Sequence, residues 1–155
     1  MRKQTQKGFS LIELLIVVAI ILIIAAIAIP NLLRSRMAAN EASAVGSLRT
    51  INTAEITFAS TYPDQGFTDL SALGGAGGAS NAAGLIDSVL ASGTKSGYTI
   101  AATAATGSTP RPSYTATAVP VNTQTGQRKF FSDQSGVIRY TTDGSDATAS
   151  SSPLQ

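Results

Sequence analysis

The sequence predicts an α+β fold in which one long amino-terminal helix precedes an antiparallel sheet. Two observations support this prediction. Leu14 to Ile29 is a run of sixteen consecutive apolar residues, and an apolar stripe with helical spacing continues beyond it. From residue 98 onward, short β-prone runs alternate with turn residues. A chain of 155 residues is long enough for about one domain, so we expect the stripe and the sheet to share one modest core.

The first part of the helix has the length of a membrane span. Phe9 to Ile29 comprises 21 residues with a single charge, Glu13. At about 1.5 Å of rise per residue, such a helix spans roughly 30 Å, the thickness of the bilayer hydrocarbon. A basic flank places the amino terminus in the cytoplasm, and three basic residues precede the run, namely Arg2, Lys3 and Lys7. We therefore expect residues 9–30 to cross a membrane and the body to lie outside the cytoplasm.

Two simpler interpretations of this segment remain open. A secretory signal peptide has an apolar core of about 7–15 residues before a small-residue cleavage site; this core is longer, although Ala25 to Ala28 imitates such a site. An ordinary anchor leaves Glu13 unexplained, because a carboxylate near the centre of a span costs on the order of 2.5–3.5 kcal/mol. Near the end of the run Glu13 can reach the headgroups. Otherwise it needs a partner, and no Lys or Arg lies between Phe9 and Leu33.

The residues around Glu13 match a known pattern. The segment Lys7-Gly8-Phe9-Ser10-Leu11-Ile12-Glu13, with the apolar run to Pro30, resembles the class III leader and amino-terminal helix of type IV pilins and pseudopilins. The resemblance covers roughly residues 1–60. It implies that a prepilin peptidase removes the leader, residues 1–8, by cutting between Gly8 and Phe9, and then methylates the new amino terminus of Phe9. It also implies that this amine pairs with Glu13 of a neighbouring subunit in a filament, and that Pro30 stands at the helix-kinking position.

Residues 31–62 are predicted to form an amphipathic second half of the helix. Pro30 removes one backbone donor, so we expect it to bend or loosen the helix without ending it. The pair Tyr62-Pro63 marks the expected end. Glu55 interrupts the apolar stripe, whose other members share one helix face: Leu33, Met37, Ala44, Leu48, Ile51 and Phe58.

The remainder is predicted to be a small body in the manner of the pilin fold. Residues 63–97 form a Gly- and Ala-rich αβ-loop region, with a short helix expected from Asn81 to Leu90. Residues 98–142 are expected to form an antiparallel sheet, which packs on the stripe, and residues 143–155 a flexible tail. The strands are expected at 98–103, 114–119, 129–132 and 137–141.

The sequence contains few of the residues that catalytic or cofactor-binding sites use. The chain has no cysteine and no histidine, which removes the commonest general base and thiolate sites. No lysine follows the glycines at 74–78 at P-loop spacing, so we expect no phosphate site. We therefore expect no enzyme, no cofactor and no metal. Three aspartates match no established calcium loop and are read as solvated turn residues, namely Asp133, Asp143 and Asp146.

The basic character of the chain is confined to its beginning. The net charge is +2, but without the three leading basic residues eight basic residues face nine acidic ones, giving −1. We expect no specific nucleic-acid binding. Four basic residues of the body are read as solvated charges, namely Arg111, Arg128, Lys129 and Arg139. The lack of cysteine departs from the many pilins whose carboxy-terminal region carries a disulfide, so another support for the body is expected.

The resemblance implies a major structural subunit of a type IV pilus, a helical homo-oligomer. Its partners would be the inner membrane, a prepilin peptidase and the pilus assembly machinery, and its final location the cell surface. Adhesion, twitching motility and DNA uptake are all compatible with it. The alternative is a pseudopilin of a type II secretion system, which the loop-rich body and the missing acidic calcium motif disfavour. A membrane-tethered enzyme is a third interpretation, without a credible catalytic set.

Overall fold

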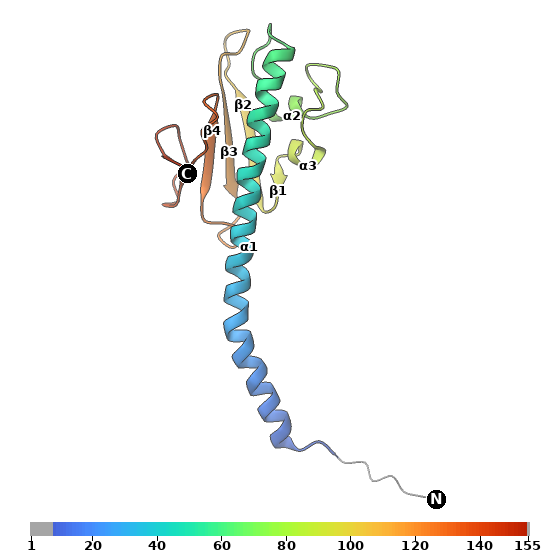
Figure 1. Ribbon diagram of the computed structural model, residues 1–155, viewed down its shortest axis with the longest axis vertical. Coiled ribbons are helices and arrows are strands. Elements are labelled where there is room, and N and C mark those ends of the chain that lie inside the picture. The colour runs from blue at the N-terminus through green and yellow to red at the C-terminus, as the bar shows by residue number, and fades with distance from the viewer. Residues whose placement is uncertain (1–7, 155) are drawn as a thin grey trace, which may run out of the picture. The chain divides into compact units, whose positions relative to one another are not determined.

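The structure, a computed structural model, describes residues 8–154, so the leader residues 1–7 and Gln155 lie outside it. Two units are distinguished, residues 1–35 and 36–155, and each is described by itself. The elements are α1 (Leu11–Thr61), α2 (Leu70–Leu73), α3 (Ser88–Ala91), β1 (Thr94–Lys95), β2 (Tyr98–Ala104), β3 (Tyr114–Pro120), β4 (Lys129–Asp133), β5 (Arg139–Thr141) and β6 (Ser152–Pro153) (Figure 1). The predicted α+β fold class is confirmed.

Helix α1 runs for 51 residues with Pro30 inside it. Proline has no backbone N–H to donate to the carbonyl four residues earlier, here that of Ala26. The helix nevertheless continues through this position, and the ribbon is unbroken there (Figure 1). Helix formers such as Leu and Ala on both sides favour this continuity. The helix ends at Thr61, immediately before the Tyr62-Pro63 pair.

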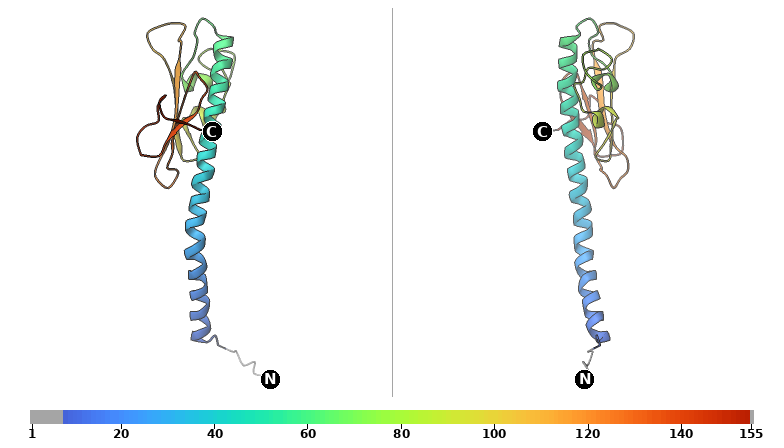
Figure 2. Two further views of the ribbon diagram at one scale, coloured as in Figure 1. Left: turned by 60° about the vertical axis from the view of Figure 1, so that its left-hand side comes forward. Right: turned by 90° about the vertical axis from the view of Figure 1, so that its right-hand side faces the viewer.

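The sheet is a six-stranded antiparallel meander in the order β1-β2-β3-β4-β5-β6. Its centre is the pair of seven-residue strands β2 and β3, aligned from Tyr98 opposite Pro120 to Ala104 opposite Tyr114. Burial alternates strictly along β2, so one face of the sheet is covered and the other is exposed. Within the second unit, the covered face lies against residues 36–61 of α1, and Figure 2 shows the helix and the sheet as two layers.

The core of the second unit lies between these two layers. From α1 it receives Leu48, Ile51 and Phe58, all fully buried, together with Ala44. The sheet contributes four large residues, namely Tyr98, Ile100, Tyr114 and Phe130. The stripe predicted from the sequence is therefore correct from Ala44 onward. It is wrong at Leu33, whose side chain is 47% exposed, because no core surrounds the helix in the first unit.

Three local predictions need correction. The helix expected from Asn81 to Leu90 is present only as α3, because Gly84 has a φ of +67°, which a helix does not accommodate. Its cap is Asp87, whose Oδ1 accepts a hydrogen bond from the N–H of Leu90 at 2.9 Å. Helix α2 was not predicted.

The strand expected at 137–141 begins only at Arg139. Ile138, immediately before it, is 7% exposed and belongs to the core. Near the end of the tail expected to be flexible, residues 143–155, Ser152–Pro153 form the short strand β6, which pairs with β5. The N–H of Leu154 donates to the carbonyl of Ile138 at 2.7 Å.

Candidate assembly site on the first part of helix α1

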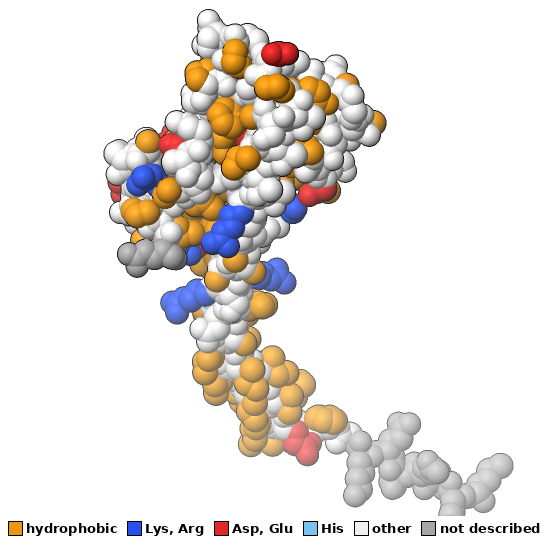
Figure 3. Space-filling view, turned by 45° about the horizontal axis from the view of Figure 1, so that its top comes forward, with side chains coloured by type: hydrophobic (Ala, Val, Ile, Leu, Met, Phe, Trp, Pro, Cys, Tyr) orange, Lys and Arg blue, Asp and Glu red, His pale blue; other side chains and the backbone are white. Residues whose placement is uncertain are grey.

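The first unit presents an almost entirely apolar helix surface. Every residue from Gly8 to Ile24 is exposed, including Phe9 at 82% and Leu11 at 80%. Figure 3 shows hydrophobic side chains covering the visible face of this part of α1. Folded proteins rarely expose contiguous apolar patches of more than a few hundred Å² unless something else covers them. Among residues 8–154, α1 is the one helix long and apolar enough to cross a membrane, and its most apolar window has a mean hydropathy of 3.3.

Glu13 lies in the first turn of this helix and makes a local contact. Its Oε2 accepts a hydrogen bond from the backbone N–H of Ser10 at 2.9 Å. The carbonyl of Ser10 in turn accepts from the N–H of Leu14 at 3.2 Å. Ser10 is therefore the N-cap and Glu13 the third helical residue, which reaches back as in one half of a capping box. The carboxylate also complements the positive end of the helix dipole.

The sequence analysis considered the headgroups and a neighbouring amine as partners of Glu13 and missed this contact. The spacing Ser10-x-x-Glu13 was the available signal, since a serine followed three residues later by a glutamate is typical of a capping box. The contact uses Oε2 only. Within residues 8–154, Oε1 of Glu13 has no hydrogen bond.

Gly8 and Phe9 precede the helix and are both exposed outside regular secondary structure. A Cβ added to Gly8 would find no atom within 4 Å, so the surroundings do not require glycine there. Backbone that is exposed and free of helical hydrogen bonds is the kind a protease can cut. The predicted cleavage position is accessible.

Comparison with known proteins matches this same segment. Residues 3–29 match the family model described as the prokaryotic N-terminal methylation motif. A stretch of 35 residues is 69% identical to the type IV wide pilus major component PilA4 of Thermus thermophilus, covering 23% of this chain and 27% of that protein. A stretch of 52 residues is 48% identical to the type IV major pilin protein PilA of Myxococcus xanthus, covering 34% of this chain and 24% of that protein. The amino-terminal segment of this chain is therefore similar to that of type IV pilins.

The likeness is limited to that segment. The chain spans about a quarter of the length of the curated relatives it matches. No solved structure matches it. Pro30 lies one residue beyond the matched methylation motif. The body of the chain is therefore described from its own contacts.

The aspartates considered for calcium have other partners. Oδ1 of Asp146 and the carbonyl of Gly144 both accept from Nζ of Lys129, at 2.9 and 2.7 Å, so an ammonium group lies between these oxygens. Asp143 accepts from Ser145, and Asp133 from the N–H of Ser135. In the part of the chain that the structure describes, no three acidic side chains gather where a metal ion could be held.

The four basic residues considered for a shared patch are each engaged separately. Arg111 pairs with Asp69 at 3.4 Å, and Arg128 with Glu41 at 2.7 Å. The other two are Lys129, bound as described, and Arg139, whose Nη1 donates to the carbonyl of Ser151 at 3.0 Å. These contacts anchor loops and give no indication of a shared anion-binding surface.

The sequence analysis missed the residues that hold α1 to the sheet without a disulfide. Oε1 of Glu41 accepts from the N–H groups of Gln127 and Arg128, and Oε2 from Nε of Arg128. The guanidinium of Arg128 also lies 5.6 Å from the ring centres of Phe130 and Tyr140. Burial raises the pKa of Glu41, but the hydrogen bonds from Gln127 and Arg128 outweigh it and hold the pKa below its ordinary value.

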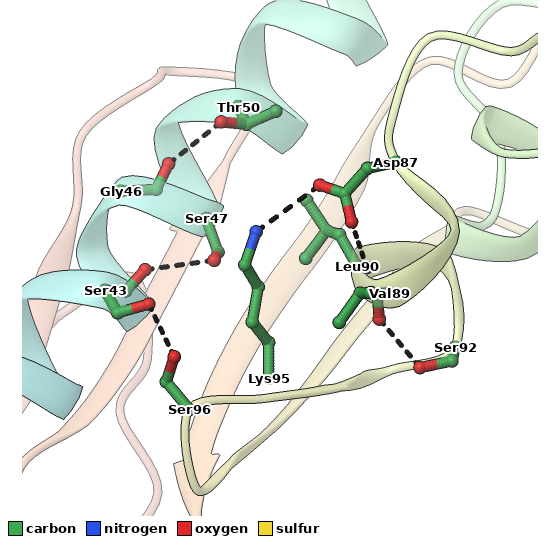
Figure 4. A network of polar contacts seen from close by, with 10 residues as sticks. All are labelled: Ser43, Gly46, Ser47, Thr50, Asp87, Val89, Leu90, Ser92, Lys95 and Ser96. Carbon is green, nitrogen blue, oxygen red and sulfur yellow. Dashed lines mark hydrogen bonds and ion pairs between the residues drawn. The ribbon is translucent and has the colours of Figure 1, made fainter.

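Two further contacts fix the same helix. Within the core, Nδ2 of Asn52 donates to Oγ of Ser132 at 2.9 Å, and its Oδ1 accepts from the hydroxyl of Tyr114 at 2.9 Å. At the surface, the hydroxyls of Ser43 and Ser96 are 2.9 Å apart, close to the ion pair of Lys95 with Asp87 (Figure 4). Such hydrogen-bonded pairs cannot be predicted from the sequence, because the two partners lie far apart along the chain.

Proposed function

We propose that this chain is the major structural subunit of a type IV pilus, which polymerises through the first part of α1 into an extracellular filament. The observation that supports this most is the exposed apolar surface from Phe9 to Leu33 with the single acid Glu13 near its start. The inner membrane covers this surface in the precursor, and neighbouring helices cover it in the filament. The relatives are both named as major pilus components, which agrees with a structural role.

Processing supplies the charge that Glu13 requires. In this proposal a prepilin peptidase cuts between Gly8 and Phe9 and methylates the amine of Phe9, which stays positively charged. As subunits are added by the assembly machinery, the amine of one subunit meets Glu13 of another within the apolar filament core. Leaving one partner of a buried ion pair unmatched costs about 3–5 kcal/mol. The pairing therefore sets the axial register of the subunits.

The local geometry of Glu13 suits this role. The hydrogen bond from Ser10 holds Oε2 at the helix start, and Oε1 remains available to accept from an ammonium group. Methylation leaves hydrogen atoms on the amine, so a charge-assisted hydrogen bond can form. Pro30 is proposed to contribute a local adjustment of the helix, because the backbone bond it lacks makes that turn easier to bend.

The experiment separates the capping role of Glu13 from its charge. Glu13→Gln keeps an oxygen that can accept from the N–H of Ser10 but removes the negative charge. Ser10→Ala is the matched control, since it changes the neighbouring side chain and keeps the backbone donor. Each variant is produced in the native host, and filaments sheared from the cell surface are counted by electron microscopy and identified by mass spectrometry.

We expect long fibres of a subunit beginning at methylated Phe9 for the unaltered chain and for Ser10→Ala. We expect few or none for Glu13→Gln, with the protein retained in the membrane. A normal fibre yield for Glu13→Gln contradicts the pairing. Loss of protein export on deletion, without surface fibres in the parent strain, identifies a pseudopilin of a type II secretion system instead.

A further inference from the structure

Glu55 is a carboxyl group buried in the core of the second unit. It lies near the end of α1 and its side chain is 0% exposed. Its Oε2 accepts a hydrogen bond from the backbone N–H of Thr68 at 3.0 Å. Its Oε1 is buried, and within the described residues 8–154 it has no hydrogen-bond partner. A carboxylate in such a place loses most of its hydration and recovers one hydrogen bond, whereas the neutral acid loses much less.

The charged and titratable neighbours of Glu55 do not offset this loss. Arg111 and Asp69 face it from the loop before β3 and from the segment before α2, and they are paired with each other at 3.4 Å. Tyr114 on β3 gives its hydroxyl hydrogen to Asn52. Burial raises the pKa of Glu55 to about 7; the N–H of Thr68 lowers it, Asp69 raises it and Arg111 lowers it.

Thr68 belongs to the segment that connects α1 with α2. This segment, residues 62–70, is also tied to the loop before β3, because the N–H of Phe67 donates to the carbonyl of Arg111 and the N–H of Arg111 to that of Gln65. The ring of Phe67 packs on Tyr114, with ring centres 4.9 Å apart. Only Thr68 joins the segment to the carboxyl of Glu55. The hydrogen bond of Thr68 is therefore the contact between this segment and α1 that the protonation state of Glu55 affects directly.

We propose that Glu55 is a proton-controlled latch: as a neutral acid it stays in the core and holds Thr68, and as a carboxylate it favours release of residues 62–70 from α1. Release admits water to Oε1 and restores the hydration that the buried charge lacks. The segment opens as a unit with the loop around Arg111, since the two share backbone hydrogen bonds. This inference concerns the second unit and stands independently of filament assembly.

The direction of the pH effect follows from proton binding. The folded chain holds the proton of Glu55 up to about pH 7, whereas the unfolded chain releases it near the ordinary value of 4.5. Between these values the folded state binds more protons, so its stability falls as pH rises. The stability that protonated Glu55 contributes is fully present below the pKa of the unfolded chain. It is lost as pH rises through the pKa of the folded chain. Because each pH unit corresponds to a factor of ten, the interval from 4.5 to about 7 leads us to expect that the closed form loses roughly 300-fold in population relative to open forms.

The test uses the full chain in detergent micelles. The carboxyl carbon of Glu55 is followed by ¹³C NMR from pH 4 to 9, with its signal assigned by its loss in Glu55→Gln. The protection of the Thr68 amide against hydrogen exchange, corrected for the intrinsic rate, is measured over the same range. We expect a titration midpoint near pH 7 and a fall in Thr68 protection across it.

Glu55→Gln, which keeps an acceptor for Thr68 and cannot ionise, should protect Thr68 equally at pH 5 and pH 8. Glu41→Gln is the control, since the pKa of the parent carboxyl is held below its ordinary value, away from the expected Glu55 midpoint. It should lower Thr68 protection by the same factor at pH 5 and pH 8 and leave its fall around pH 7 in place. A Glu55 midpoint near 4.5, or a Glu55→Gln chain with the same pH-dependent protection as the parent, overturns the proposal. If Glu55→Gln does not fold, the signal is assigned by backbone connectivity and the parent midpoint alone decides.

Discussion

The backbone N–H of Ser10 donates to Oε2 of Glu13 at 2.9 Å, across the first turn of α1. Glu13, the one charged residue in the apolar run, therefore has a structural role in capping the start of α1. Two uses of the same carboxylate are compatible, because the cap occupies one oxygen and the proposed amine needs the other. Local capping and the proposed subunit pairing therefore both involve Glu13, and only the pairing requires its negative charge.

Glu13→Ala should leave membrane insertion intact. Removing a charge from the apolar run lowers the insertion cost by up to about 2.5–3.5 kcal/mol, and by less near the end of the span. The lost cap costs about 0.5–2 kcal/mol of local helix stability, which a long span tolerates. Resistance of the expressed protein to alkaline carbonate extraction measures this. A variant found in the soluble fraction would show that Glu13 is needed before assembly.

Glu41→Gln should destabilise the second unit by about 1.5–3 kcal/mol, because Arg128 loses a charge-assisted hydrogen bond. The folded pKa of Glu41 lies below its ordinary value, so its contribution to stability is present above that value and is lost as pH falls through the lower, folded one. Urea unfolding at several pH values measures both effects. The difference between parent and variant should shrink in acid, and a constant difference would contradict the ion pair.

Asn52→Ala should cost about 1–3 kcal/mol of unfolding free energy, since it leaves the buried hydroxyls of Tyr114 and Ser132 without their partner. Thr53→Ala is the matched control. Its hydroxyl bonds only to the carbonyl of Arg49 one turn earlier and is exposed. Chemical denaturation followed by near-ultraviolet circular dichroism should separate the two variants by more than 1 kcal/mol. Equal effects would mean that the Asn52 contacts contribute little.

Leu48→Ala should be among the more damaging single changes on α1, costing about 2–5 kcal/mol through lost burial and the cavity it leaves. Leu48 is 0% exposed in the core between the helix and the sheet. Ile56→Ala, at a position 58% exposed on the same helix, should stay within about 0.5 kcal/mol in an isolated subunit. Thermal unfolding in micelles compares them. A large effect of Ile56→Ala would indicate a contact made between copies.

Much of the fold was accessible from sequence patterns. Apolar spacing located the buried face of α1 at Leu48, Ile51 and Phe58, and a β-prone run between turn residues located β2. The short helices α2 and α3 were not located correctly, because each has only four residues, too few to show a helical apolar pattern in the sequence. The strand β6 escaped as well, since a Ser-Pro pair has little β propensity of its own and is held by pairing with β5.

The amino-terminal motif can be recognised from the sequence alone. The apolar run, the basic residues before it and the spacing of Gly8, Phe9 and Glu13 are all properties of neighbouring residues. The tertiary structure alone decided which acids of the body are ionised and paired. Glu41 binds Arg128, which lies 87 positions later in the sequence. Glu55 is buried in the core, where it accepts one hydrogen bond, from the N–H of Thr68. Burial and long-range partners set the free energy of a charge, and neither exists until the chain has folded.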